Sequence, residues 1–595
     1  MKQLISNMML IASTVIMTGC SATDPISEWN NDTDWGGTLP GQGQSTGGSS
    51  GGSSGGSSAT TGELTTFDVS LDLTAAEPTT TATAYLPDEE DALENNSFGT
   101  EVAIDLSNPT ARTENGVEIS VNGGHITVNH GSTKGICYVV SGTTDNGSLT
   151  VMGDKKYELI LNGAHINNPD SAALNLLSGK RAFIVLAEGT SNTLTDGTGG
   201  SQKGALYCKG KLLFSGSGQL SVTGNTNNAI HSADYIIFNR YNHIYAKSTA
   251  NHGIKANDGV FINGGIINVE VSADAAKGIN CESHIVVNGG RTTVITTGNG
   301  TYDTDDQEAK GAAGIKADST FTINAGELWL KSTGSGGKGI NVDMDAYFCG
   351  GNVYVVTEGG QFKSNNDTSS PKGIKVDGNL NISGGTIWVR TNGYNGEGIE
   401  TKSNLNISGG ETACYAYDDA INATGDMTIT GGYVYAQGRN NDGLDANGNI
   451  YLKGGLVYAV SAGQPEVAID ANTEGGKKLY LTGGTIVAIG GLENGSSLTQ
   501  TCYQTSTWNQ NTRYTLSYDG NSFSFVTPSS SNGTMVVSAA ASPSLTAGSS
   551  VSGGSTIFGG LGTMGGTVSG GSSVTLSTYT GGNSMGGGGW PGGWR

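Results

Sequence analysis

The chain has 595 residues, of which 97 are glycine, and only 14% of the residues are charged. Glycine makes up about 7% of an average globular protein, so this composition predicts a repetitive fold. The formal charge of -22, from 52 acidic and 30 basic residues, argues against nucleic acid or an anionic membrane as the main partner. Cations and neutral ligands fit this charge balance better.

The first 20 residues resemble a bacterial export signal. The apolar run from Met8 to Met17 is too short to span a bilayer, and a threonine, a glycine and Cys20 follow it. This stretch resembles a lipobox, so we expect Cys20 to be lipidated; a signal peptide with an incidental cysteine is the alternative. The expected location is an exported lipoprotein at the cell surface or outer membrane, with the lipid as its only membrane contact.

Composition divides the rest of the chain into segments. Residues 21–62 are acidic and then rich in Gly and Ser, which predicts a flexible linker. We expect an N-terminal cap over 63–116, a repetitive body over 117–495, a C-terminal β cap over 496–540 and a loosely ordered Gly-rich tail over 541–595. A hairpin is expected from Tyr514 to Phe525, across Asp519 and Gly520.

Six cysteines besides Cys20 are widely spaced and form no C-x-x-C pair, which excludes a zinc finger. They stand at positions 137, 208, 281, 349, 414 and 502. Disulfides are permitted in an exported protein. Cys281 and Cys414, however, occupy positions where neighbouring repeats have apolar residues, so we expect buried free thiols there.

A phrase with a Gly-Gly pair recurs from about residue 250 to 490, commonly every 25 residues. Examples are GIKANDGVFINGGIINVEV from Gly253, GIKVDGNLNISGGTIWVRT from Gly373 and GLDANGNIYLKGGLVYAVSA from Gly443. Period-two alternation without a helical period predicts two or three short strands per repeat. The expected fold is therefore all-β, a right-handed single-stranded parallel β-helix of on the order of 14 coils with flexible Gly/Ser-rich ends. A β-propeller is the alternative, but its blades need roughly 40 residues each.

The alternation separates inward from outward side chains in each repeat. In the repeat from Gly373, the predicted interior residues are Ile374, Val376, Leu380, Ile382, Ile387 and Val389. Lys375, Asp377 and Trp388 then face outwards. Because every coil has the same register, equivalent outward positions stack into columns along the helix axis.

One outward column is aromatic. Its members in successive coils are Trp329, Tyr354, Trp388, Ala413, Tyr435 and Tyr458. Exposed ring faces in a row suit the C–H faces of sugar rings, so the five aromatic residues are candidate carbohydrate-binding residues. The alternative is structural: the rings stabilise the solenoid face or pack under a loop or the tail.

Two further outward columns change from basic to acidic along the stack. One runs through Lys255, Asn280, Lys316, Asn341, Lys375, Glu400, Asn422, Asp445 and Asp470, and the other through Lys277, Lys338, Lys372, Glu397, Asp419 and Asp442. Carboxylates stacked at about 5 Å repel each other unless cations bind. The candidate calcium ligands are therefore Glu397, Glu400, Asp418, Asp419, Asp442, Asp445 and Asp470, with a solvated acidic face as the alternative.

The basic half is a candidate glycan site. Its lysines are partly neutralised by acids two residues further on, but Lys316, Lys338, Lys372 and Lys375 lie beside the two longest insertions. These insertions, near residues 299–311 and 359–371, enter at the same corner of the coil. We expect them to flank the basic strip and form a cleft.

Three segments resemble a bacterial family of exported carbohydrate-binding β-helix proteins: YELILNGAHI from Tyr157, FIVLAEGTSNTLTDG from Phe183 and LLFSGSGQLSVTG from Leu212. With the Gly-Gly repeats, the similarity covers roughly residues 115 to 525. Members of this family are similar in fold to pectate-type polysaccharide lyases, contain calcium, and bind cellulose and acidic plant-wall glycans. The resemblance implies that residues 117–495 form a non-catalytic, calcium-containing polysaccharide-binding domain.

One feature of the repeats departs from the family pattern. An Asp often precedes the leading Gly-Ile in the family, whereas Lys277, Lys338 and Lys372 occupy that position in the middle coils. A metal site in those coils is therefore in doubt, and the coils from Glu397 onward match better.

Two other functions remain open from the sequence. A calcium-dependent polysaccharide lyase would need a base, and Lys316, Lys375 or Arg390 are candidates, although nothing in the sequence marks one of them as activated. A structural adhesin would use the solenoid as a stalk. We expect a monomeric polysaccharide binder with no nucleic-acid partner.

Overall fold

The computed structural model describes residues 62–72, 74–80 and 82–581. Cys20, the predicted signal peptide and nearly all of the predicted linker lie outside the described residues. Within the described ranges, regular structure consists of β-strands and three short 3₁₀ helices, η1 (Glu89–Asp91), η2 (Leu93–Asn95) and η3 (Phe558–Gly560). None of these described helices is long and apolar enough to cross a membrane. The predicted all-β class is confirmed.

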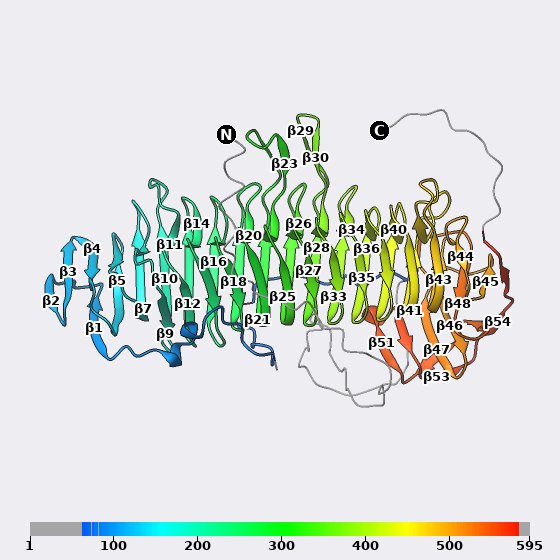
Figure 1. The fold of residues 1–595 in the computed structure, drawn as a ribbon, viewed down its shortest axis with the longest axis horizontal. Coiled ribbons are helices and arrows are strands. Elements are labelled where there is room, and N and C mark those ends of the chain that lie inside the picture. The colour runs from blue at the N-terminus through cyan, green and yellow to red at the C-terminus, as the bar shows by residue number, and fades with distance from the viewer. Residues whose placement is uncertain (1–61, 73, 81, 582–595) are drawn as a thin grey trace, which may run out of the picture. The chain divides into compact units, whose positions relative to one another are not determined.

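Parallel strands stack into a β-solenoid of about 15 turns, which confirms the predicted parallel β-helix (Figure 1). We call its three sides the first, second and third faces. The first face is a sheet of 16 described strands: β2 (Arg112–Glu114), β3 (Val117–Asn122), β4 (Gly124–Asn129), β6 (Gly147–Met152), β8 (Leu174–Leu176), β11 (Gly204–Cys208), β14 (Asn228–Ser232), β17 (Ile254–Ala256), β20 (Lys277–Cys281), β24 (Ala313–Ala317), β26 (Lys338–Val342), β31 (Lys372–Val376), β34 (Glu397–Thr401), β37 (Ile421–Ala423), β40 (Leu444–Ala446) and β42 (Ile469–Ala471).

The second and third faces share one sheet, because several long strands bend from one face into the other. Its described strands are β1 (Thr100–Asp105), β5 (Ile136–Thr144), β7 (Tyr157–Asn168), β9 (Ala182–Leu186), β10 (Ser191–Asp196), β12 (Leu212–Gly216), β13 (Gln219–Gly224), β15 (Tyr235–Phe238), β16 (His243–Ser248), β18 (Gly259–Ile262), β19 (Ile266–Val271), β21 (His284–Thr296), β25 (Phe321–Ser332), β27 (Ala346–Phe348), β28 (Asn352–Thr357), β32 (Leu380–Ile382), β33 (Thr386–Thr391), β35 (Leu405–Ile407), β36 (Glu411–Ala416), β38 (Met427–Ile429), β39 (Tyr433–Gly438), β41 (Ile450–Val460), β43 (Leu479–Ile489), β44 (Ser497–Leu498), β45 (Cys502–Thr505), β48 (Met535–Ser538) and β55 (Ser577–Tyr579). In a typical coil, a first-face strand such as β31 is followed by β32 on the second face and β33 on the third.

The Gly-Gly pair forms the corner between the second and third faces. Its second glycine has a positive φ, for example 82° at Gly385 and 75° at Gly410. A Cβ at Gly410 would lie 2.7 Å from the carbonyl oxygen of Gly385 in the preceding coil. Glycine is needed here because the backbones of successive coils meet closely at a left-handed conformation.

Inward side chains fill one continuous apolar interior. All six residues predicted to point inwards in the repeat from Gly373 are buried, each 2% exposed or less. Cys281 and Cys414 are buried free thiols within this interior, as predicted. The alternation of the sequence therefore places these side chains correctly.

Additional strands close both ends of the stack, where an open parallel edge would otherwise remain. At the N-terminal end, β2, β3 and β4 pair antiparallel. At the C-terminal end, β48 pairs antiparallel with β43 and β45. A C-terminal module follows, with a sheet of the described strands β46 (Arg513–Tyr518), β47 (Asn521–Val526), β49 (Ser544–Ala547), β51 (Ser555–Ile557), β52 (Gly562–Met564) and β54 (Ser572–Val574), and a separate pair of β50 (Ser550–Ser552) and β53 (Thr567–Ser569).

The C-terminal module differs from the expected loosely ordered tail. The hairpin predicted across Asp519 and Gly520 is present as β46–β47. Within residues 541–581, however, β49, β51, β52 and β54 extend this sheet, β50 pairs with β53, and β55 pairs with β45. Gly-Ser-rich composition predicts a flexible chain, but hydrogen bonds between strands order this segment.

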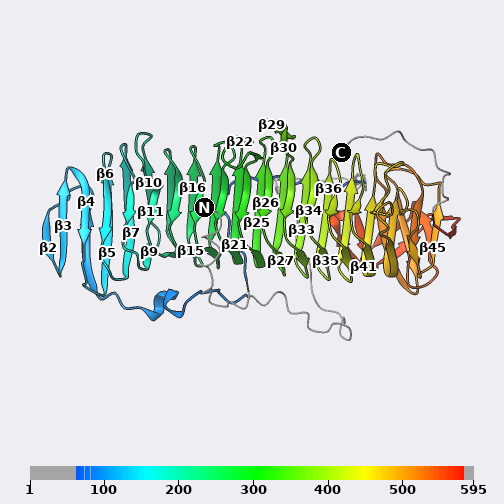
Figure 2. The same cartoon turned by 45° about the horizontal axis from the view of Figure 1, so that its top comes forward.

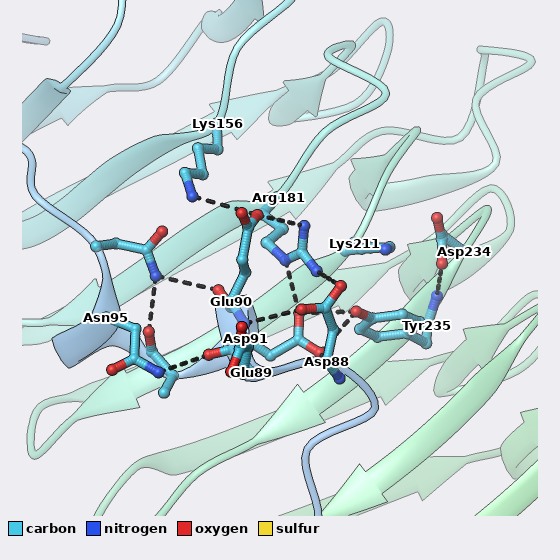
Figure 3. A network of polar contacts seen from close by, with 12 residues as sticks. Asp88, Glu89, Glu90, Asp91, Asn95, Lys156, Arg181, Lys211, Asp234 and Tyr235 are labelled. Atoms are coloured by element: carbon cyan, nitrogen blue, oxygen red, sulfur yellow. Dashed lines mark hydrogen bonds and ion pairs between the residues drawn. The ribbon is translucent and has the colours of Figure 1, made fainter. Parts of the chain in front are cut away.

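An extended strap, residues 62–72, 74–80 and 82–98, runs along the outside of the coils (Figure 2). Figure 3 shows how η1 anchors it. The fully buried Asp91 accepts one hydrogen bond from Nε of Arg181 at 2.7 Å and another from the Tyr235 hydroxyl at 2.7 Å. Arg181 also pairs with Asp88 at 2.7 Å and with Glu90 at 3.2 Å. The strap is therefore held to two coils by an ionic cluster centred on the buried Asp91.

Arg181→Met should release the strap locally, because it leaves the buried Asp91 carboxylate without its cation. Breaking a buried ion pair in this way costs about 3–5 kcal/mol. Faster hydrogen exchange of the backbone amides of residues 86–96 would report the release. The matched control is Lys156→Met, because Lys156 pairs with Glu90 at 3.3 Å with over a third of its side chain exposed, a pair worth about 0–1 kcal/mol. Unchanged exchange in Arg181→Met would contradict the anchoring role.

Candidate functional site

The strand register confirms that the charged residues of the first face form continuous columns. Lys316 pairs in register with Asn341, which pairs with Lys375, and Lys375 pairs with Glu400. The same column continues through Asn422 and Asp445 to Asp470. Parallel in-register pairing fixes these neighbours, so the change from basic to acidic along the face is a property of the fold.

The basic half of the face is largely neutralised by its own acids. Lys316 forms ion pairs with Asp318 at 2.9 Å and Asp343 at 2.5 Å, and Lys375 pairs with Asp377 at 2.6 Å. The predicted neutralisation by acids two residues further on is therefore present. A ligand carboxylate at Lys316 or Lys375 would have to compete with these partners.

The two long insertions form antiparallel hairpins that project from one corner of the stack (Figure 1). They are β22 (Thr301–Asp303) with β23 (Glu308–Lys310), and β29 (Phe362–Ser364) with β30 (Asp367–Ser369). The backbone N–H of Ala309 donates to the Asp367 carboxylate at 2.7 Å. The two hairpins therefore contact each other through this hydrogen bond.

Two lysines lie at the base of these hairpins. Nζ of Lys338 donates to the Ser369 hydroxyl at 2.8 Å and to the Gly336 carbonyl at 3.2 Å. Nζ of Lys277 donates to the Gly311 carbonyl at 2.7 Å. Burial, with the charges of neighbouring lysines, lowers the pKa of Lys338 to about 7 and that of Lys277 to about 8. The partners of these two amines are therefore neutral oxygens rather than carboxylates.

The acidic half begins with a buried charge cluster. Lys372 pairs with Glu397 at 2.7 Å and with Glu400 at 3.2 Å, and Lys402 also pairs with Glu400. Burial raises the pKa of Glu397. Burial opposes ionisation of Glu400 as well, but the two lysines hold its pKa below the ordinary value. One carboxylate oxygen of each glutamate, Oε2, is buried without a hydrogen-bond partner.

Three of the predicted metal ligands converge further along the face. Asp442, Asp445 and Asp470 each place a carboxylate oxygen within 4.8 Å of the other two. Among the described residues, no lysine or arginine forms an ion pair with any of them. Oxygens that bind one Ca²⁺ at about 2.4 Å lie at most about 4.8 Å apart, so the spacing of the three carboxylates fits a hard cation.

Asp418 and Asp419 lie in the intervening coil. Nδ2 of Asn422 donates to Asp419 at 3.2 Å and to Asp445 at 3.0 Å, and so links a carboxylate of each column. Nδ2 of Asn441 donates to Asp418 at 3.0 Å. The sequence placed Asn422 in the column, but its bridging role was missed because it depends on side-chain direction.

Burial and mutual repulsion raise the pKa values of these carboxyl groups above their ordinary range. Burial, then Asp470 and Asp419, raises the pKa of Asp442 to about 9. Burial also raises the pKa of Asp419 to about 8 and that of Asp445 to about 6. Burial and the neighbouring Glu493 raise the pKa of Asp470 to about 8. Without a cation, several of these groups are protonated near neutral pH.

The aromatic column has the predicted order, but the expectation that its rings are exposed is wrong. Trp329 pairs in register with Tyr354, Tyr354 with Trp388, and Tyr435 with Tyr458. Trp329 is 2% exposed, Trp388 is 7% exposed, and Tyr435 and Tyr458 are fully buried; only Tyr354 is half-buried. As folded, the two fully buried tyrosines offer no ring face to a sugar.

The strap and the C-terminal module cover the aromatic column. The ring centroid of Phe67, in the strap, lies 5.8 Å from that of Tyr354 and 6.2 Å from that of Trp388. From the module, Phe525 lies 5.2 Å from Tyr458. The Tyr458 hydroxyl also donates to the Val526 carbonyl at 2.8 Å. The structural alternative is therefore the correct one for the buried rings, which pack beneath the strap or the C-terminal module.

One exposed aromatic cluster was missed in the sequence. Tyr394 and Tyr417 occupy the same corner of successive coils, between the third and first faces, and Arg439 follows in the next coil. Tyr394 is 58% exposed. The signal in the sequence was a ring or guanidinium in the turn after the third-face strand, but turn residues do not follow the alternation that identifies strands.

Comparisons with known proteins place similarity in the earlier coils. A family model described as carbohydrate-binding domain-containing protein matches residues 122–277 and 272–357. A carbohydrate-binding domain-containing protein from Acetivibrio thermocellus is 31% identical over 112 residues, covering 17% of this chain and 39% of that relative. The chain thus matches well under half of the relative's length.

One solved structure, a gadolinium derivative of a polysaccharide lyase-like protein from C. thermocellum, also aligns with the chain. It has 22% sequence identity and a TM-score of 0.32, and the alignment covers 44% of this chain and 94% of that one. The chain therefore resembles carbohydrate-binding domain proteins over residues 122–357, and the acidic coils from Glu397 onward lie beyond the family match.

Tyr458→Ala should destabilise the protein, because it opens a cavity between the third face and the C-terminal module. Truncating a buried aromatic side chain costs about 3–5 kcal/mol. Tyr458→Phe keeps the ring but leaves the Val526 carbonyl without its donor, and should cost about 1 kcal/mol. Urea denaturation, monitored by tryptophan fluorescence, measures the free energy of unfolding of both variants. Wild-type stability of Tyr458→Ala would show that the module does not pack on this column.

The stability of the cation-free protein should fall as the pH rises from about 5 to about 9. The pKa values of Asp419, Asp442, Asp445 and Asp470 are raised on folding, so in this range the folded state binds more protons than the unfolded state. This contribution to the stability is lost as the pH rises through the pKa values that these groups have in the folded state.

Thermal unfolding in the presence of a chelator at several pH values measures the slope of stability against pH. The double variant Asp442→Asn with Asp470→Asn should flatten it, while Asp519→Asn, an exposed turn residue, should not. Equal slopes in the wild type and the double variant would contradict the assignment.

Proposed function

We propose that this chain is a polysaccharide-binding protein that holds calcium on its first face. The match of residues 122–357 to a carbohydrate-binding family model is the observation that carries the polysaccharide part of this proposal. The converging carboxylates of Asp442, Asp445 and Asp470 support the calcium part. The glycan site is proposed at the acidic half of the first face and its adjoining corner.

The donor set of this cluster suits calcium. Carboxylate oxygens are hard ligands, and the three aspartates bring one oxygen each to a common position. Burial and then the neighbouring acids raise the pKa values of these groups, and a divalent cation would remove the repulsion between the acids. Bound calcium would also offer its remaining coordination positions to oxygens of the glycan.

The proposed glycan site does not extend over the lysine strip. The predicted binding residues Lys316, Lys338, Lys372 and Lys375 already have protein oxygens as partners. In the acidic half, by contrast, Oε2 of Glu397 and Oε2 of Glu400 are buried without a hydrogen-bond partner. A ligand gains more where partners are missing than where it must displace existing ion pairs.

We propose binding without catalysis. Of the candidate lyase bases, Lys316 and Lys375 are held in ion pairs, and Nη1 of Arg390 donates to the Leu64 carbonyl beneath the strap. Burial lowers the pKa of Lys338 to about 7, but its amine is engaged by Ser369 at the base of the hairpin. No arrangement in the described residues favours the lyase over the binder.

The proposal includes export and anchoring through Cys20. It rests on the sequence of residues 1–20 and on the flexible composition of the linker that follows. A tethered binder of this kind would collect polysaccharide at a distance from the membrane.

Isothermal titration of the full chain with polygalacturonate and with a neutral β-glucan, each with calcium and with chelator, tests the proposal. We expect polygalacturonate to bind in calcium and to lose binding in chelator. The double variant Asp442→Asn with Asp470→Asn should behave like the chelated protein, and Asp519→Asn should behave like the wild type. No heat with either glycan would overturn the proposal and favour the adhesin, whereas ultraviolet-absorbing unsaturated products would favour the lyase.

A further inference from the structure

Three successive coils place an aromatic and basic cluster at the corner between the third and first faces. Tyr394 lies between β33 and β34, Tyr417 between β36 and β37, and Arg439 between β39 and β40. The ring centroids of the two tyrosines are 5.2 Å apart, at an interplanar angle of 57°. The Arg439 guanidinium lies 4.7 Å from the Tyr417 ring centroid. The three side chains therefore form one contiguous surface cluster.

Backbone hydrogen bonds fix the turns that carry this cluster. The N–H of Gly396 donates to the Gly393 carbonyl at 3.0 Å and closes the turn around Tyr394. The N–H of Asn440 donates to the Tyr417 carbonyl at 3.0 Å, and its side-chain amide donates to the same oxygen at 3.1 Å. Adjacent coils thus hold the corner in place, so little ordering is needed when a ligand binds.

The cluster has the chemistry of a site for an acidic sugar. Tyr394 is 58% exposed, which leaves much of a large ring open to solvent. Within the described part of the chain, no carboxylate forms an ion pair with Arg439. The Arg439 guanidinium is thus held on the Tyr417 ring and has no carboxylate partner among the described residues. Its guanidinium can receive a carboxylate through two parallel hydrogen bonds.

The surroundings of the cluster match the proposed glycan site. Gly360, at the base of the β29–β30 hairpin, lies next to Tyr394, since a Cβ there would be 3.7 Å from the Cβ of Tyr394. Tyr417 directly precedes Asp418 and Asp419 of the acidic half. The corner is therefore bounded by the hairpins at one end and is continuous with the carboxylates proposed to hold calcium.

We propose that Tyr394, Tyr417 and Arg439 form a binding subsite for a uronate residue of an acidic polysaccharide. The C–H face of the sugar ring packs on Tyr394, and its carboxylate pairs with Arg439, which Tyr417 positions. This inference rests on the proposed function and deepens it by placing an acidic rather than a neutral sugar at this corner.

Titration calorimetry of full-chain variants with polygalacturonate in calcium tests the subsite. Tyr394→Ala and Arg439→Gln should each weaken binding at least about tenfold. Arg439→Lys should recover only part of the loss, because an ammonium cannot make the paired hydrogen bonds. Tyr241→Ala is the matched control, since Tyr241 is 64% exposed and lies outside this corner.

Two further readouts separate the possible failures. Circular dichroism and calcium affinity should stay at wild-type values in all four variants, because the substituted side chains are not predicted calcium ligands. If wild-type protein binds no acidic glycan, the proposed function fails. If the wild type binds and both Tyr394→Ala and Arg439→Gln bind equally well, the subsite is wrong while the proposed function stands.

Discussion

The in-register backbone hydrogen bonding between coils is the constraint on which the rest of the structure depends. Each strand pairs with the equivalent strand of the next coil, so a residue in one coil lies beside its counterpart in the next. The Gly-Gly corner keeps this register, because a side chain at Gly410 would meet the neighbouring backbone. A residue type that recurs at the same position of successive repeats therefore forms a column of like side chains, and neighbours in this column attract or repel each other.

The consequences of stacking differ between faces. On the third face, stacked rings make a surface too apolar to leave exposed, and Phe67 and Phe525 cover it from opposite ends of the chain. On the first face, the stacked lysines are neutralised by ion pairs with acids two residues further on. Where the columns become acidic, as at Asp442 and Asp470, burial and then repulsion between acids raise the pKa values and leave a position that suits a cation.

The polar chemistry of the molecule is therefore concentrated along one edge. The hairpins, the exposed ring of Tyr394, the guanidinium of Arg439 and the acidic column all lie at or beside the corner between the third and first faces. A rigid solenoid with variable corner loops allows such a site to be built without disturbing the core. The coils matched by the carbohydrate-binding family model supply the scaffold, and the later coils supply this particular combination of side chains.

The sequence by itself determined the fold class, the columns and their order, because strand alternation and a regular repeat leave one register that buries residues such as Ile374 and Val389. It also determined the hairpin at Asp519 and Gly520. Only the tertiary structure decided that Tyr458 is buried, since the covering residues come from elsewhere in the chain. The same holds for the grouping of carboxylates, which depends on side-chain directions and on long-range partners that a repeat pattern does not encode.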